Sequence, residues 1–167
     1  MSSDDVWVEN NVGRSPRLLA AIPCEDGAVS FAMNDTRVTL QRIFYEVYAA
    51  EFPAVFERLN IATIWMGGDG DYTVGVRLSA PNGTVISEVT VGYESRPEPA
   101  TVIHLFHFSN DGGVLLTLPE AGRYAVDVLL DDVPIWSFPF FAVAVPTGGR
   151  PEMETEIVAV GEEVSDG

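Results

Sequence analysis

The sequence predicts an all-β fold, an immunoglobulin-like antiparallel β-sandwich of about eight or nine strands. Two observations support this prediction. Short apolar segments with period-two alternation recur along the chain, separated by turn signals roughly every 8 to 12 residues. The step Gly122-Arg123-Tyr124 enters the alternating run Ala125–Leu129, and a turn at Asp131-Asp132 then leads to the apolar run Ile135–Val145. This arrangement is typical of the last hairpin of a sandwich.

Tyr124 indicates the immunoglobulin-like type. We expect its ring in the core and its hydroxyl group bonded to nearby backbone, as in a tyrosine corner. Such a sandwich hosts many unrelated functions, so the prediction concerns architecture and not activity.

The expected strand segments follow from the same alternation. Ten apolar segments are the candidates for these eight or nine strands, in chain order Leu18–Cys24, Ala28–Met33, Val38–Ala50, Leu59–Met66, Tyr72–Ala80, Val85–Tyr93, Val102–Phe108, Val114–Leu118, Ala125–Leu129 and Ile135–Val145. The clearest turn between them is Pro81-Asn82-Gly83-Thr84, because proline presets φ and Asn-Gly tolerates positive φ.

The segment Val38–Ala50 fits two structures. Its apolar residues follow a helical i, i+3, i+4 pattern behind a possible cap at Asn34 or Asp35. Most of them are also β-branched or aromatic, which suits a pleated surface. We predict a long strand here, with a helix as the alternative.

Several short motifs together resemble a bacterial family of small single-domain proteins of unknown function. They are Cys24-Glu25-Asp26, Ile43-Phe44-Tyr45-Glu46-Val47, Phe52-Pro53, Pro81-Asn82-Gly83 and Gly122-x-Tyr124 with a downstream Asp pair. The resemblance covers about Leu18–Val145 and implies a single immunoglobulin-like sandwich without an established activity. The chain differs from the usual pattern at Arg42, where the family has glycine, and at Val133, where glycine usually follows the Asp pair.

The domain organisation follows from composition. Residues 1–16 are expected to form a flexible N-terminal arm, residues 17–146 the sandwich, and residues 147–167 an acidic C-terminal tail, with both tails disordered. The start of the chain lacks the features of a signal peptide and the only cysteine is Cys24, so we expect a cytoplasmic protein.

The charge restricts the partners. Nine arginines and no lysine face twenty-five acidic residues, giving a net charge of -16. Because phosphates and anionic lipids require a clustered basic surface, we expect neither nucleic acid nor a membrane as partner.

Residues with catalytic chemistry are scarce. His104 and His107 are three apart in one expected strand and therefore point to opposite faces. No nucleophile motif or cysteine-rich metal motif is present, so we predict no enzyme and no cofactor. The weak candidates for a divalent metal, and for a metal-dependent enzyme, are Asp69, Asp71, Asp131 and Asp132.

The leading functional hypothesis is a non-enzymatic interaction module that acts through a sheet face or edge strand. An alternative is a carbohydrate-binding or envelope-associated domain that stacks sugars on Trp65 and Trp136. The run Ile135–Val145 carries no charge and contains Pro139, which belongs at a sheet edge or a bulge and not in a central strand. We therefore expect the run at or near an edge. Such an edge needs a cover. We predict a homodimer or another protein partner there, with the tail segment Ile157–Val160 as the alternative cover.

Overall fold

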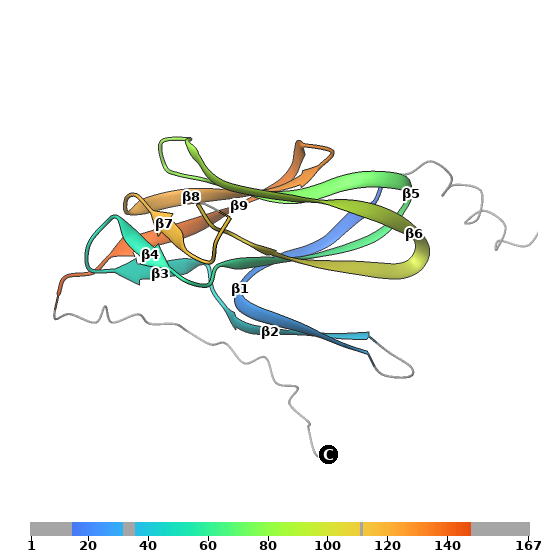
Figure 1. The fold of residues 1–167 in the computed structure, drawn as a ribbon, viewed down its shortest axis with the longest axis horizontal. Helices are drawn as coiled ribbons and strands as arrows, with labels where there is room; N and C mark the ends of the chain where they lie inside the picture. Colours follow the sequence, from blue (N-terminus) through green and yellow to red (C-terminus); the bar gives the residue numbers. More distant parts are fainter. Residues whose placement is uncertain (1–14, 32–35, 111, 148–167) are drawn as a thin grey trace, which may run out of the picture.

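The computed structural model describes residues 15–31, 36–110 and 112–147, and this part of the chain is all-β without a helix (Figure 1). None of it could therefore cross a membrane as an apolar helix. The predicted arm lies almost entirely outside the described residues, as does the predicted acidic tail with Ile157–Val160.

The described residues form nine strands. They are β1 (Arg17–Phe31), β2 (Thr36–Ile43), β3 (Glu46–Ala49), β4 (Ala54–Phe56), β5 (Asn60–Ser79), β6 (Val85–His107), β7 (Leu116–Leu118), β8 (Gly122–Leu130) and β9 (Val133–Ala144).

Seven of these strands belong to one sheet, ordered β2-β1-β5-β8-β9-β3, with β6 paired along β5. The sheet has two halves, and the long hairpin of β5 and β6 belongs to both. In one half, Val74–Ser79 of β5 pairs with β8, close to the β5–β6 turn. In the other half, Asn60–Met66 of β5 pairs with β1. The two halves lie one above the other in Figure 1, while β4 and β7 form a separate two-stranded sheet at one end.

Glycines permit the change of direction between the two halves. Gly67, Gly68 and Gly70 have φ angles of 73°, 99° and 117°, and the β5–β6 register shifts at the same place. L-residues with a Cβ rarely adopt these angles. The expected strands Leu59–Met66 and Tyr72–Ala80 are therefore parts of one strand that bends instead of ending.

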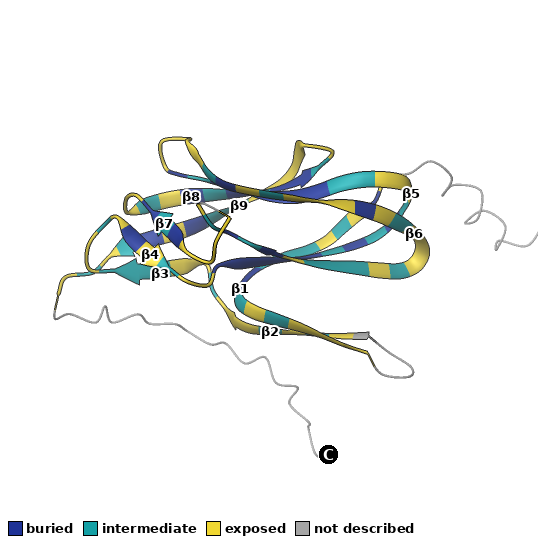
Figure 2. Ribbon diagram, viewed as in Figure 1, coloured by how far each residue is buried: buried dark blue, intermediate teal, exposed yellow. Residues whose placement is uncertain are grey.

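The core fills the space between the two halves, where Figure 2 shows buried residues on the facing ribbons. Its largest fully buried side chains include Trp65, Tyr124, Phe108 and Phe140. The prediction for Tyr124 is confirmed. Its hydroxyl donates to the carbonyl oxygen of Glu120 at 2.6 Å and accepts from the Glu120 N–H at 3.3 Å.

The expected segment Val38–Ala50 is extended, but the prediction of a single long strand is wrong. It divides into β2, which pairs antiparallel with β1, and β3, which pairs parallel with β9. Arg42 lies at the end of β2 with a φ of 50°. The chain turns at this left-handed residue and passes from β2, in one half of the sheet, to β3, in the other half.

Candidate functional site

Strand β9 is covered along only part of its outer side. Its residues Val133–Ala142 pair with β8, whereas β3 pairs only with residues Phe141–Ala144. Among the described residues, the stretch Val133–Phe140 therefore has a neighbouring strand on one side alone. We call this stretch the open edge of β9.

Pro139 faces away from β8. The N–H of Phe141 donates to the carbonyl oxygen of Tyr45 at 2.8 Å, on the β3 side. Because main-chain groups alternate with a period of two, the nitrogen of Pro139 points to that same outer side. The sequence-based prediction that Pro139 lies at an edge is thus confirmed. The expected covers of this edge were a partner protein or the segment Ile157–Val160. The structure adds a third cover that was not predicted, because β3 of the same chain pairs with the last residues of β9.

Three apolar side chains are exposed along the open edge. The exposed fractions are 59% for Val133, 42% for Ile135 and 58% for Trp136. Trp136 pairs with Val128, which is fully buried, so both side chains project from the same face of the sheet. Core side chains cover Val128 completely and leave more than half of Trp136 exposed. No residue from Val133 to Val145 carries a charge.

The four candidate aspartates do not form a metal site. The described residues contain no group of three or more His, Cys, Asp or Glu side chains that could hold a metal ion. Asp131 instead closes the β8–β9 turn. Its carboxylate accepts the N–H of Thr73 at 2.8 Å, and its own N–H donates to the Thr73 carbonyl at 2.7 Å. Asp131 and Asp132 have φ angles of 49° and 63°, as a tight hairpin turn requires.

The two candidate tryptophans lie in different environments. Trp65 is fully buried, and its indole N–H donates to the hydroxyl of Thr63 at 2.9 Å. Its ring is not accessible to a sugar at the surface. Trp136 is accessible, so the structure leaves a single ring of the predicted pair for such stacking.

The histidines and the cysteine are also separated. His104 packs against the rings of Tyr93 and Phe106. Its Nδ1 atom has no hydrogen-bond partner within the described part of the chain, and burial lowers its pKa. His107 instead has Nδ1 at 2.9 Å from Oδ1 of Asn60. Cys24 is fully buried, and its pKa is raised by burial and by the charge of Asp26.

Two adjoining pockets near the end of β9 were not predicted from the sequence. The first, of about 370 Å³, is mainly apolar, and we call it the apolar pocket. The second, of about 530 Å³, is the polar pocket. Both are lined by Glu25, Glu57 and Arg58. The remaining walls of the apolar pocket include Phe44, Val47, Phe56, Leu116, Leu118 and Phe140, and those of the polar pocket include Asp26, Asn60 and His107.

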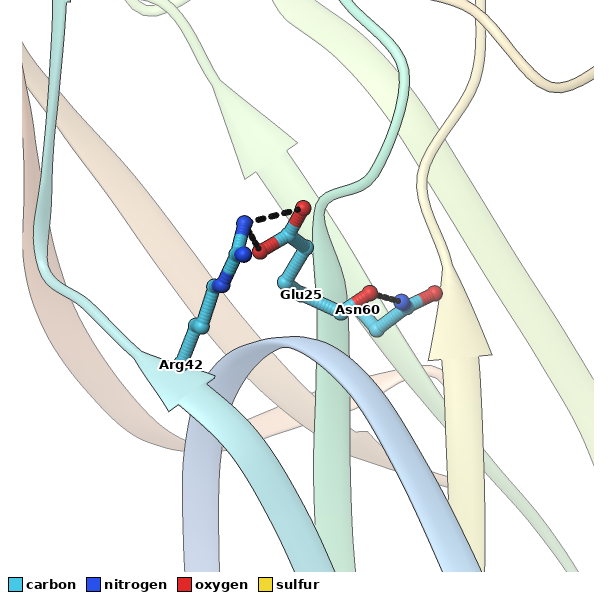
Figure 3. A network of polar contacts seen from close by, with 3 residues as sticks. All are labelled: Glu25, Arg42 and Asn60. Carbon is cyan, nitrogen blue, oxygen red and sulfur yellow. Dashed lines mark hydrogen bonds and ion pairs between the residues drawn. The ribbon is translucent and has the colours of Figure 1, made fainter.

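Glu25 lines both pockets. Figure 3 shows its contacts with Arg42 and Asn60. The guanidinium group of Arg42 bonds both of its carboxylate oxygens, at 2.9 and 3.3 Å. The side-chain amide of Asn60 donates to its main-chain carbonyl at 2.6 Å. Asn60 is buried, and it connects Glu25 to His107 through its other amide atom.

No local pattern marks these pockets, because their walls come from segments far apart in the chain. Phe44 and Leu118 fit the apolar alternation expected of core residues, while Glu25 and Arg58 fit an exposed surface. Only the turn at Arg42 and the neighbouring β4–β7 pair bring them together.

A family model described as a family of unknown function (DUF6941) matches residues 26–143, which include every strand from the second half of β1 to nearly the end of β9. No curated protein matches the chain.

Proposed function

The chain belongs to DUF6941, a family of unknown function, and from this premise we propose that it is a non-enzymatic interaction module with an immunoglobulin-like sandwich fold. It acts through the open edge of β9. Its partner is a second copy of the chain, paired edge to edge.

The observation that carries this proposal is the exposed apolar edge itself. Val133, Ile135 and Trp136 leave apolar surface in water along the stretch of β9 that has no outer neighbour among the described residues. Unpaired strand edges of this kind pair with another chain unless they are blocked. Burying the exposed parts of these side chains stabilises a complex by about 25 cal/mol per Å² of apolar surface.

The charge of the chain opposes self-association and thereby gives a test. Two copies each carry a net charge of -16, although the open edge itself is uncharged. At 0.1 M salt, repulsion between exposed charges more than about 10 Å apart is largely screened, and higher salt shortens this distance. Dimerisation should therefore tighten as salt is raised.

The non-enzymatic part rests on the separation of the reactive groups. Cys24 is buried, His104 is enclosed by aromatic rings, and His107 lies on the opposite face of β6. Catalysis by a nucleophile and a base requires both groups within hydrogen-bond reach of one another.

Sedimentation velocity of the full chain tests the proposal. We expect a concentration-dependent dimer that is lost in the Trp136→Glu variant and retained in Val55→Glu. Val55 is a matched control because its exposed fraction is also 58%, on β4. A monomer for the unmodified chain at high concentration and high salt contradicts the proposal. Binding on a glycan array that Trp136→Glu abolishes would instead support a carbohydrate-binding domain.

A further inference from the structure

The apolar pocket has room for more than one side chain. A cavity of about 150 Å³ lined by aliphatic and aromatic residues already binds benzene. The apolar pocket measures about 370 Å³ and is open to solvent. Leu116, Leu118 and Phe140 line it and are fully buried, so the pocket lies directly beside the core. Two neighbouring apolar side chains of a ligand fit this volume.

The polar pocket favours a positive charge. Three carboxylates line it, from Glu25, Asp26 and Glu57, against the single guanidinium of Arg58. These three carboxylates and one guanidinium together carry a charge of -2. Arg42 pairs with Glu25, but Glu57 is exposed and has no ion-pair partner among the described residues. A cation that enters beside Glu57 therefore gains an attractive interaction.

Two contacts orient Glu25, which lines both pockets. Its carboxylate is paired with Arg42, and its main-chain carbonyl accepts a hydrogen bond from the buried Asn60. A carboxylate that is already oriented loses little side-chain entropy when it binds a cation. The apolar and the cationic part of a ligand would thus be recognised at a fixed separation.

We infer that the two pockets form one binding site for an extended peptide segment of a partner protein, in which apolar residues are followed by lysine or arginine. The apolar side chains occupy the apolar pocket and the cation occupies the polar pocket. This site lies beyond the open edge of β9, and it does not depend on the proposed dimer.

The charge of the chain argues against an occupant from this protein. Residues 148–167 contain six acidic residues and one arginine, which gives them the same sign as the polar pocket. A second copy offers no lysine, and its nine arginines belong to a chain with a net charge of -16. Charge complementarity therefore selects a different, basic partner.

Binding of blocked peptides to the full ¹⁵N-labelled chain tests the inference. The probe is a hexapeptide with two leucines followed by two lysines. One control peptide replaces the lysines by glutamates, and the other replaces the leucines by serines. We expect the leucine–lysine peptide to bind roughly tenfold more tightly than either control, since it alone satisfies both pockets. The amide signals of Val47, Glu57 and Asn60 should shift.

Two variants assign the binding to the pockets. Glu57→Arg should weaken the leucine–lysine peptide roughly tenfold and improve the glutamate peptide, because the sign of the rim charge changes. Glu94→Arg makes the same change of charge outside both pockets and should leave binding unaltered. Val47→Trp fills the apolar pocket and should abolish binding. If that variant does not fold, Glu57→Arg still decides, since Glu57 is an exposed residue.

Three results overturn the inference. The first is the absence of shifts at these residues up to millimolar peptide. The second is equal loss of binding in Glu57→Arg and Glu94→Arg, which would indicate attraction by net charge alone. The third is binding of hexylammonium as tight as that of the peptide, which would assign the site to small organic cations instead.

Discussion

Arg42 offers a sharp test of the backbone geometry that joins the two halves of the sheet. Its φ angle of 50° lies in the left-handed region, which costs an L-residue about 1–2 kcal/mol and costs glycine almost nothing. The resemblance to a family with glycine at this position agrees with that geometry. We expect Arg42→Gly to unfold at higher denaturant concentration than Arg42→Ala.

The expected difference in the free energy of unfolding follows from comparing Arg42→Gly with Arg42→Ala. Both lose the ion pair with Glu25, in which the Arg42 side chain is 80% exposed, so this shared loss is about 0–1 kcal/mol. Only glycine relieves the left-handed conformation. Against this gain, glycine adds about 0.4–1 kcal/mol of unfolded-state entropy. The glycine variant should therefore be more stable than the alanine variant by about 0.5–1 kcal/mol, or about 2–4 °C in Tm.

Urea unfolding followed by tryptophan fluorescence measures this difference, because Trp65 is fully buried in the folded chain. In about 1 M salt the ion pair is screened, so the unmodified chain and Arg42→Ala should approach each other while the glycine advantage persists. An alanine variant as stable as the glycine variant would show that the left-handed turn carries no cost, and would refute the reasoning.

Three further predictions concern other parts of the domain. Tyr124→Phe keeps the buried ring and removes the hydroxyl that bonds to Glu120, so urea unfolding should show a loss of about 1–1.5 kcal/mol, and an unchanged midpoint would contradict the corner. The pKa of His104 is lowered by burial below its ordinary value of 6.5, so its contribution to stability is present above pH 6.5 and is lost as the pH falls through the lowered value. His104→Phe should therefore flatten the dependence of the urea midpoint on pH between about 7.5 and 5, and an equally steep dependence in the variant would contradict this. Pro139→Ala supplies an outward N–H at the open edge and should tighten self-association in sedimentation experiments, whereas unaltered association would mean that the edge is not the contact.

Some features of the structure depended on the chemistry of single residues and were therefore predictable. Pro139 lacks an N–H, and it lies at the edge where that loss breaks no ladder bond. Tyr124 has an apolar ring and one polar atom, and the corner places each in a suitable environment.

Other features depended on contacts between distant segments. The apolar residues of Val38–Ala50 follow one pattern through both β2 and β3. This pattern therefore does not reveal that β2 pairs with β1 and β3 pairs with β9. Likewise, Trp65 and Trp136 are the same residue in similar apolar runs, yet one is fully buried and the other is 58% exposed. The difference arises because the facing half of the sheet covers one position and does not reach the other.

The all-β class and the last hairpin are predictable from local features, because alternation, turn residues and proline act within a short segment. Contacts between distant segments set which edge stays open and which side chains line the two pockets. Glu25, Phe44, Phe56 and Phe140 share a site only because the chain turns at Arg42 and β3 pairs with β9. That arrangement is set by non-local strand pairing and by burial of the shared core, which no single segment encodes.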